Sequence, residues 1–128
     1  DAAQADIAVG CRVARTVGSL DIGQAVVIQQ GMVLGVEAIE GTDALLARCG
    51  DLRREGPGGV LVKLKKPGQE ARVDLPAIGA TTVQGAHAAG LVGIAIEAGG
   101  ALVIDLPAVV AAADEAGLFV IGVTPSGP

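Results

Sequence analysis

The feature that most constrains the fold is a motif that occurs twice in the last third of the chain. Residues 73–77 read Val-Asp-Leu-Pro-Ala, and residues 104–108 read Ile-Asp-Leu-Pro-Ala. Each copy continues through a helix-compatible stretch and an Ala-Gly-Leu tripeptide into an apolar run, at residues 92–96 and 119–123. Each copy predicts a βαβ unit, which consists of a strand, an Asp cap, a Pro in the first helical turn, a Gly C-cap and a second strand. Near-continuous apolar runs are typical of parallel strands that are covered on both faces, so we predict an α/β fold.

The first part of the chain adds a helix and a hairpin. Apolar residues recur at three- and four-residue spacing from residue 3 to residue 20, which predicts an amphipathic helix. The stripe comprises Ile7, Cys11, Ala14, Val17 and Leu20. Two β-rich runs flank Gln30-Gly31, which has the form of a tight hairpin turn. We therefore expect a mixed, mostly parallel sheet with helices packed on it and β-hairpin additions.

Further local signals predict a second helix and two more strands. Thr42 is expected to be the N-cap of a short helix at 43–49, which Gly50 ends. The elements expected after it are a loop at 55–59, a strand at 60–65, a turn at 66–69 and a short strand at 71–74.

Composition limits the class of protein. The 128 residues are 51% hydrophobic and can bury the core of one domain, so we assign residues 1–128 to a single domain. The net charge of −5 and the lack of Tyr and Trp argue against a nucleic-acid partner. The longest uncharged stretch, 75–96, contains Pro76 and four glycines, unlike a membrane-spanning helix. Cys11 and Cys49 lack a partner motif, and we expect free, buried thiols.

Three stretches place polar groups where the carboxyl ends of the strands should gather, which is where α/β sheets bind ligands. In the first, residues 36–43, a strand ends in a glycine turn and a helix begins. Free amides there, with Thr42 and the Gly41 backbone, can hold a phosphate. The alternative is an ordinary capped helix in which Glu40 and Asp43 complement the helix dipole. These two acidic residues would also repel a phosphate unless a cation intervenes.

The second stretch is a cluster of basic residues in an acidic chain. Residues 63–72 contain four of the nine basic residues, and Lys63, Lys65 and Arg72 have strand spacing, so several can share a face. They form either a solvated edge strand protected by lysines or a cationic wall for a diphosphate. The sequence leaves both interpretations open.

The third stretch centres on Asp74. An Asp that ends a strand beside Arg72 can stay ionised, ligate a hard divalent cation or position a water. Its counterpart Asp105 lacks basic neighbours and is expected to cap a helix, which is also the alternative for Asp74. The single histidine, His87, has no second His and no nearby Cys, so no zinc site is expected.

Three motifs in a fixed order carry a family resemblance. They are residues 35–43 (Gly-Val-Glu-Ala-Ile-Glu-Gly-Thr-Asp), 60–67 (Val-Leu-Val-Lys-Leu-Lys-Lys-Pro) with Gln69, and 72–79 (Arg-Val-Asp-Leu-Pro-Ala-Ile-Gly). The closing residues 117–122 (Gly-Leu-Phe-Val-Ile-Gly) are similar too. Together they resemble the carboxy-terminal domain of the UDP-2,3-diacylglucosamine pyrophosphatases of lipid A biosynthesis, the type unrelated to calcineurin-like phosphoesterases. The resemblance covers nearly all of the chain.

The resemblance implies an activity, a cofactor and a compartment. It implies hydrolysis of UDP-2,3-diacylglucosamine to UMP and 2,3-diacylglucosamine 1-phosphate in the cytoplasm of a Gram-negative bacterium. It also implies Mg2+ or another hard divalent cation such as Mn2+, and an essential aspartate at Asp74. The remaining candidates are Lys63, Lys65, Gln69, Arg72, Gly41, Thr42 and Thr82 as substrate contacts, and Asp74, Glu40 and Asp43 as metal ligands.

The resemblance also implies partners. We expect the chain to be the carboxy-terminal catalytic domain of a longer protein, whose own amino-terminal domain supplies half of the cleft. The other expected partners are the lipid-linked nucleotide-sugar substrate, the inner membrane as a peripheral contact, and a second copy in a homo-oligomer. Two alternative functions stay open, which are a non-catalytic domain that binds a nucleotide-sugar lipid and a pyrophosphatase for another sugar nucleotide.

Overall fold

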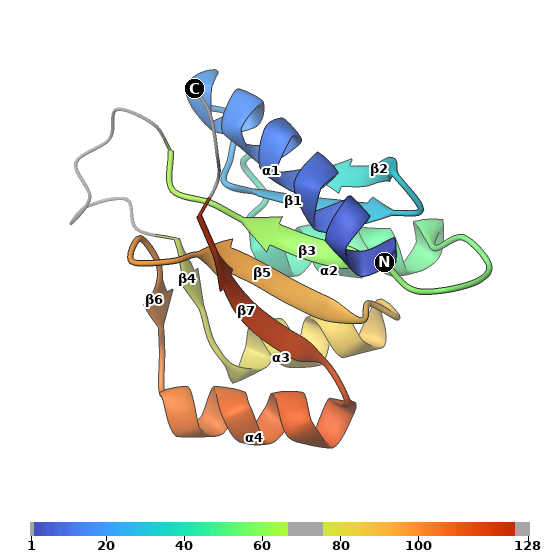
Figure 1. The fold of residues 1–128 in the computed structure, drawn as a ribbon, viewed down its shortest axis with the longest axis vertical. Helices are drawn as coiled ribbons and strands as arrows, with labels where there is room; N and C mark the ends of the chain where they lie inside the picture. Colours follow the sequence, from blue (N-terminus) through green and yellow to red (C-terminus); the bar gives the residue numbers. More distant parts are fainter. Residues whose placement is uncertain (1, 67–75, 125–128) are drawn as a thin grey trace.

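A central sheet with a hydrophobic core on each face organises the fold (Figure 1). The structure is a computed structural model that describes residues 2–66 and 76–124. Within those residues the main sheet has five strands in the order β2-β1-β3-β5-β7. They are β1 (Ala25–Gln29), β2 (Met32–Val36), β3 (Val60–Lys63), β5 (Gly93–Glu97) and β7 (Phe119–Val123). Strands β3, β5 and β7 are parallel, and β1 is antiparallel to both β2 and β3.

Four helices in the described part of the chain cover the two faces. Helix α1 (Ala2–Ser19) packs on one face, and α2 (Thr42–Leu52), α3 (Ala80–Ala88) and α4 (Leu106–Ala116) pack on the other. Strand β3 sends Val60 and Val62 into the α1 core and Leu61 into the opposite core, as the two-residue period of a strand requires. This arrangement confirms the predicted α/β fold with a mixed sheet. No helix among the described residues has the length and apolar character needed to span a membrane.

The predicted hairpin is confirmed. Strands β1 and β2 pair in antiparallel fashion around Gln30 and Gly31, whose φ angles are 56° and 77°. A two-residue hairpin loop with both φ angles positive has the twist that matches its strands. The loop predicted at 55–59 is also confirmed, whereas the predicted strand at 71–74 lies outside the described residues.

The predictions for two helices, α1 and α2, need correction. The N-cap of α2 is Gly41, with φ 87°, and Thr42 is the first helical residue. Thr42 does not cap because its hydroxyl is bonded to Glu37 instead of to a helix amide. Helix α2 also continues through Gly50 to Leu52. In α1, Leu20 lies beyond the helix end and is 65% exposed.

The repeated motif occupies different structural positions in its two copies. In the second copy, Asp105 caps α4 and Gly117 ends it with φ 72°, as predicted. At the end of the first copy, however, the chain forms a short strand β4 (Ala77–Ile78) before α3, whose N-cap is Gly79. The helix expected directly after the first motif therefore begins only at Ala80, and Asp74 itself lies outside the described residues. Strand β4 pairs in parallel with β6 (Leu102–Val103). Strand β6 precedes the second motif, whereas β4 lies at the end of the first, so the two paired strands do not hold equivalent positions in the two copies.

Candidate active site

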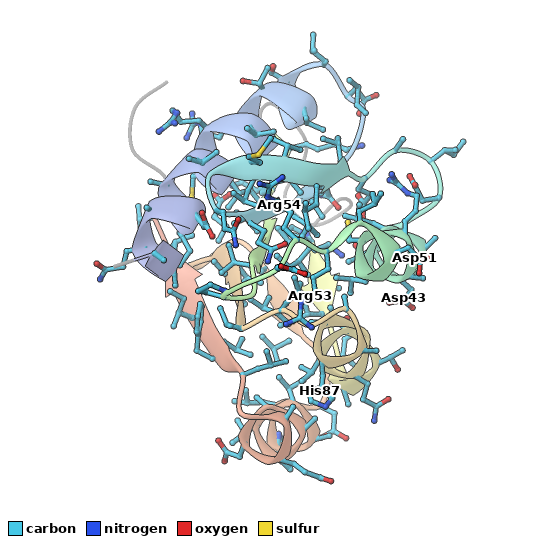
Figure 2. All side chains as sticks on the ribbon, turned by 90° about the vertical axis from the view of Figure 1, so that its right-hand side faces the viewer. Asp43, Asp51, Arg53, Arg54 and His87 are labelled. Carbon is cyan, nitrogen blue, oxygen red and sulfur yellow. The ribbon has the colours of Figure 1, made fainter. Side chains whose placement is uncertain are left out.

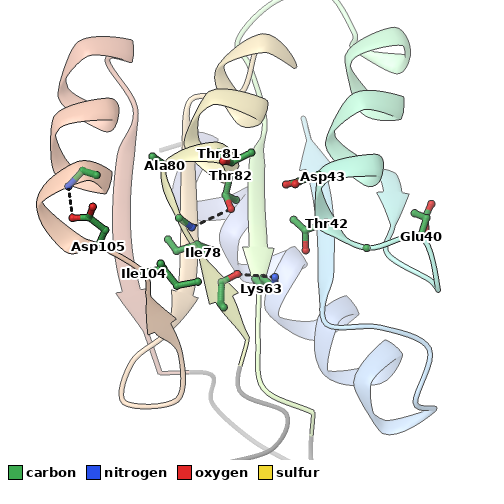
Figure 3. A pocket seen from close by; sticks show the side chains of 14 residues that line it. Glu40, Thr42, Asp43, Lys63, Ile78, Ala80, Thr81, Thr82, Ile104 and Asp105 are labelled. Atoms are coloured by element: carbon green, nitrogen blue, oxygen red, sulfur yellow. Dashed lines mark hydrogen bonds between the residues drawn. The ribbon is translucent and has the colours of Figure 1, made fainter.

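A cavity of about 540 Å³ lies where three helices of the described chain begin, next to the carboxyl end of β3 (Figure 3). It is lined by residues 40–43 at the start of α2, Lys63 of β3, residues 77–82 around the start of α3, and residues 104, 105 and 108 at the start of α4. The first backbone N–H groups of a helix have no partner within the helix, and its dipole is positive at that end. The cavity therefore favours a negatively charged ligand.

Lys63 places a cation on the cavity wall. Its side chain crosses from the end of β3 to the next strand, where Nζ donates a hydrogen bond to the Ala77 carbonyl at 2.8 Å (Figure 3). Lys63 is only 9% exposed, and burial lowers the pKa of its ammonium below the ordinary value for lysine. The carboxylates of Glu37 and Asp43 oppose this shift because they favour the charged form.

Three polar side chains, those of Glu40, Thr42 and Asp43, lie at the start of α2. In Figure 3, Thr42 and Asp43 lie nearer to Lys63 than Glu40 does. The Glu40 carboxylate accepts a hydrogen bond from the Ala38 amide at 2.7 Å and pairs with Arg48 at 2.7 Å. The Ala38 hydrogen bond and the Arg48 charge hold the pKa of Glu40 below its usual range. Arg48 therefore offsets one of the two negative charges that would repel an anion here.

The starts of α3 and α4 form the opposite wall. The Gly79 amide donates to Thr82 Oγ1 at 3.2 Å, and Thr82 is 7% exposed. Asp105 has φ 55°, and its carboxylate accepts a hydrogen bond from the Ala108 amide at 3.3 Å. Asp105 thus caps α4, as expected, and also lines the cavity, which the sequence did not indicate.

The structure gathers six of the predicted site residues at one cavity. They are Glu40, Gly41, Thr42, Asp43, Lys63 and Thr82. Lys65 is not among the described lining residues, and its backbone N–H donates to Glu97 Oε1 at 3.0 Å. Three further candidates, Gln69, Arg72 and Asp74, lie outside the described residues.

The metal-ligand prediction stays a prediction. Within residues 2–66 and 76–124, no group of three or more His, Cys, Asp and Glu side chains is arranged to hold a metal ion. The predicted set included Asp74, which is not described. His87, on α3, faces α4 (Figure 2) and is not among the residues that line this cavity. Cys49 is buried and Cys11 is half-buried, and both thiols are free, as expected from the sequence.

One residue next to the cavity was missed. Glu37 follows β2 and is 7% exposed, and it accepts hydrogen bonds from the Thr42 hydroxyl and, at 2.9 Å, from the Gln24 amide. The available signal was an acidic residue directly after an apolar strand. Glu40 and Asp43 were the acidic candidates predicted from the sequence, because they flank the glycine turn.

The fold and cavity define an α/β domain suited to an anionic ligand at the carboxyl end of its sheet. Residues 1–121 match the family model described as the LpxI C-terminal domain, and the chain belongs to that family. The chain is 56% identical over 127 residues to the UDP-2,3-diacylglucosamine pyrophosphatase LpxI of Caulobacter vibrioides (strain ATCC 19089 / CIP 103742 / CB 15). That alignment covers 94% of this chain and 45% of the relative, so the chain spans about half the length of the relative it matches. The family resemblance inferred from the three motifs is confirmed.

Proposed function

We propose that the protein containing this domain hydrolyses the pyrophosphate bond of UDP-2,3-diacylglucosamine for lipid A biosynthesis. Water is added across one P–O bond of the bridge, giving UMP and 2,3-diacylglucosamine 1-phosphate. The observation that carries the proposal is the cavity, where three helix starts meet the Lys63 ammonium. The Caulobacter relative, which is named for this activity, supports the choice of substrate.

The cavity suits the electrostatics of this reaction. A diphosphate is a concentrated anion, and negative charge on its oxygens must be balanced as water attacks. Lys63 and the positive ends of the three helix dipoles supply fixed positive charge for that purpose. We assign the essential carboxylate to Asp74, and further substrate contacts to Lys65, Gln69 and Arg72, on the strength of the motif resemblance.

We propose that the reaction depends on Mg2+ or Mn2+. Carboxylate oxygens are the donors these hard cations prefer, and Asp43 and Asp105 both line the cavity. We assign the ion to Asp43 and Asp74, and Glu40 would have to leave Arg48 to join them. A bound ion would neutralise diphosphate charge and lower the pKa of a coordinated water.

Our proposal for the cellular setting follows the same family membership. An amino-terminal domain would complete the cleft, and the enzyme would act in the cytoplasm with peripheral contact to the inner membrane, where its lipid substrate resides. We also propose that the protein forms a homo-oligomer.

The test is UMP release from UDP-2,3-diacylglucosamine by the full-length protein, with and without Mg2+. Wild type, Asp74→Ala and the exposed control Asp51→Ala are compared, with circular dichroism on all three. We expect turnover that requires Mg2+, is lost in Asp74→Ala with an unchanged spectrum, and is kept in Asp51→Ala. Full activity of Asp74→Ala would remove Asp74 from the chemistry. Binding of the substrate without turnover under any metal would favour a non-catalytic binding domain.

A further inference from the structure

Glu37 is a buried carboxylate that the backbone holds firmly beside the cavity. Its amide donates to the Ala25 carbonyl at 2.8 Å, which ties it to the start of β1. The neighbouring loop packs directly against it, because a Cβ at Gly23 would lie 2.1 Å from the Glu37 carbonyl oxygen. The backbone of Glu37 is therefore fixed by contacts with the start of β1 and with the loop at Gly23, and its buried side chain has little freedom to move.

The two carboxylate oxygens of Glu37 have separate partners. Oε1 accepts from the Gln24 amide at 2.9 Å, and Oε2 accepts from the Thr42 hydroxyl. A hydroxyl has one hydrogen to donate and two lone pairs. Because Thr42 donates that hydrogen to Glu37, its oxygen can only accept at the cavity wall.

Thr82, on the other wall, has the opposite polarity. Its oxygen accepts one hydrogen bond from the Gly79 amide, and none of the hydrogen bonds among the described residues uses its hydroxyl hydrogen, which can therefore be donated to a ligand. The two threonines that line the cavity therefore differ, since Thr82 suits a phosphate oxygen and Thr42 does not. This difference is invisible in the sequence, where both were grouped as substrate contacts.

We propose that Glu37 is a positioning residue that turns the Thr42 hydroxyl into an obligate acceptor for a positively polarised group, either a substrate O–H or N–H or the divalent cation. This inference rests on the proposed function and refines how that site recognises its ligands. The negative charge of Glu37 also acts on Lys63, where it opposes the lowering of the ammonium pKa by burial.

An isosteric substitution tests the hydroxyl polarity. In Glu37→Gln, the amide oxygen can still accept from Gln24 N–H, while the amide nitrogen must donate to Thr42 and so releases the hydroxyl hydrogen toward the cavity. We expect kcat/KM for UDP-2,3-diacylglucosamine to fall about 10-fold or more in the full-length protein, with an unchanged melting temperature. Thr42→Val should show a similar loss, and the double variant should be no worse than the poorer single one.

Thr42→Ser is the matched control, because it keeps the hydroxyl and should retain activity within about threefold. Equal activity of Thr42→Ser and Thr42→Val would overturn the inference, even if Glu37→Gln failed to fold. So would multiplied losses in the double variant, or wild-type activity in Glu37→Gln. A wild type that does not hydrolyse the substrate would instead overturn the proposed function, and this inference with it.

Binding measurements distinguish the two sources of positive charge. Calorimetry of Mn2+ with Thr42→Val and wild type asks whether the hydroxyl oxygen contacts the cation. Weaker Mn2+ binding in the variant would assign the cation to Thr42, whereas unchanged Mn2+ binding with a raised KM would assign a substrate O–H or N–H. Unchanged Mn2+ binding together with an unchanged KM and kcat would overturn the acceptor role.

Discussion

Lys63 and Lys65 are two residues apart, yet the structure gives them different surroundings. In a continuous strand they would share a face, but β3 ends at Lys63 and the two-residue period ends with it. Lys63 is buried on the cavity wall, whereas Lys65 is half-buried and does not line the described cavity. A cationic wall was one of the two interpretations of this spacing, and among the described residues it is Lys63 that lines the cavity.

We predict that Lys63→Met lowers kcat/KM by about 100-fold, the usual loss when a fixed partner of transition-state charge is removed. Lys65→Met should cost clearly less, because its side chain lies outside the described cavity. Steady-state kinetics of both variants in the full-length protein measure this ratio. Equal losses would show that both lysines reach the diphosphate, as the sequence alone suggested.

A second prediction at residue scale concerns Asp6 of α1, which is 4% exposed. Its carboxylate accepts hydrogen bonds from the Gln30 amide at 3.2 Å and the Gly31 amide at 2.8 Å, and so ties α1 to the hairpin turn. Asp6→Asn leaves one oxygen for two amides, and we expect a loss of about 1–2 kcal/mol in the free energy of unfolding. Urea denaturation measures it, with the exposed Asp51→Asn as a control that should change stability by less than about 0.5 kcal/mol.

At the scale of elements, helix α1 approaches the sheet through Gly10. A Cβ at this position would lie 2.4 Å from Cγ2 of Val62, a β-branched side chain held in the core. In the last turn of α2, by contrast, a Cβ at Gly50 would have its nearest neighbour, Ala89 Cα, at 3.6 Å, an ordinary contact. Both residues lie within helices, so helix propensity favours alanine at each.

We predict that alanine substitutions at Gly10 and Gly50 change the free energy of unfolding in opposite directions. Gly50→Ala should stabilise the domain by about 0.5–1 kcal/mol through helix propensity. Gly10→Ala should destabilise it by about 1–3 kcal/mol, because overpacking against Val62 outweighs the same propensity gain. Urea denaturation of the two variants measures both changes in the free energy of unfolding. A stabilised Gly10→Ala would mean that α1 can move away from the sheet at little cost.

Prediction from sequence succeeded for elements whose signals are local. The Gln30-Gly31 hairpin and the Asp105-capped helix carry their turn and cap residues within a few positions, and both formed as expected. The N-cap of α2 was misassigned because Thr42 bonds to Glu37, a partner outside the helix. The start of α3 was misplaced because β4 pairs with β6, about 25 residues away.

At the scale of the whole molecule, the described residues form two hydrophobic cores, while the domain that would complete the cavity is part of our proposal. The alignment with the Caulobacter relative covers 45% of that protein. We predict that the 128-residue chain alone unfolds cooperatively in urea yet releases no UMP, whereas the full-length protein is active. Circular dichroism and the UMP assay on both forms measure this. Turnover by the isolated chain near the full-length rate would place the whole catalytic centre within it.

The sequence by itself determined the α/β class, the hairpin, the family and six of the residues that line the cavity, because these depend on apolar periodicity, turn chemistry and motif order along the chain. Only the tertiary structure decided which polar groups meet. It brought the starts of α2, α3 and α4 to the end of β3 and paired Glu37 with Thr42. It also neutralised Glu40 with Arg48. Such pairings depend on contacts between distant elements and on the direction of single hydrogen bonds, neither of which a residue pattern specifies.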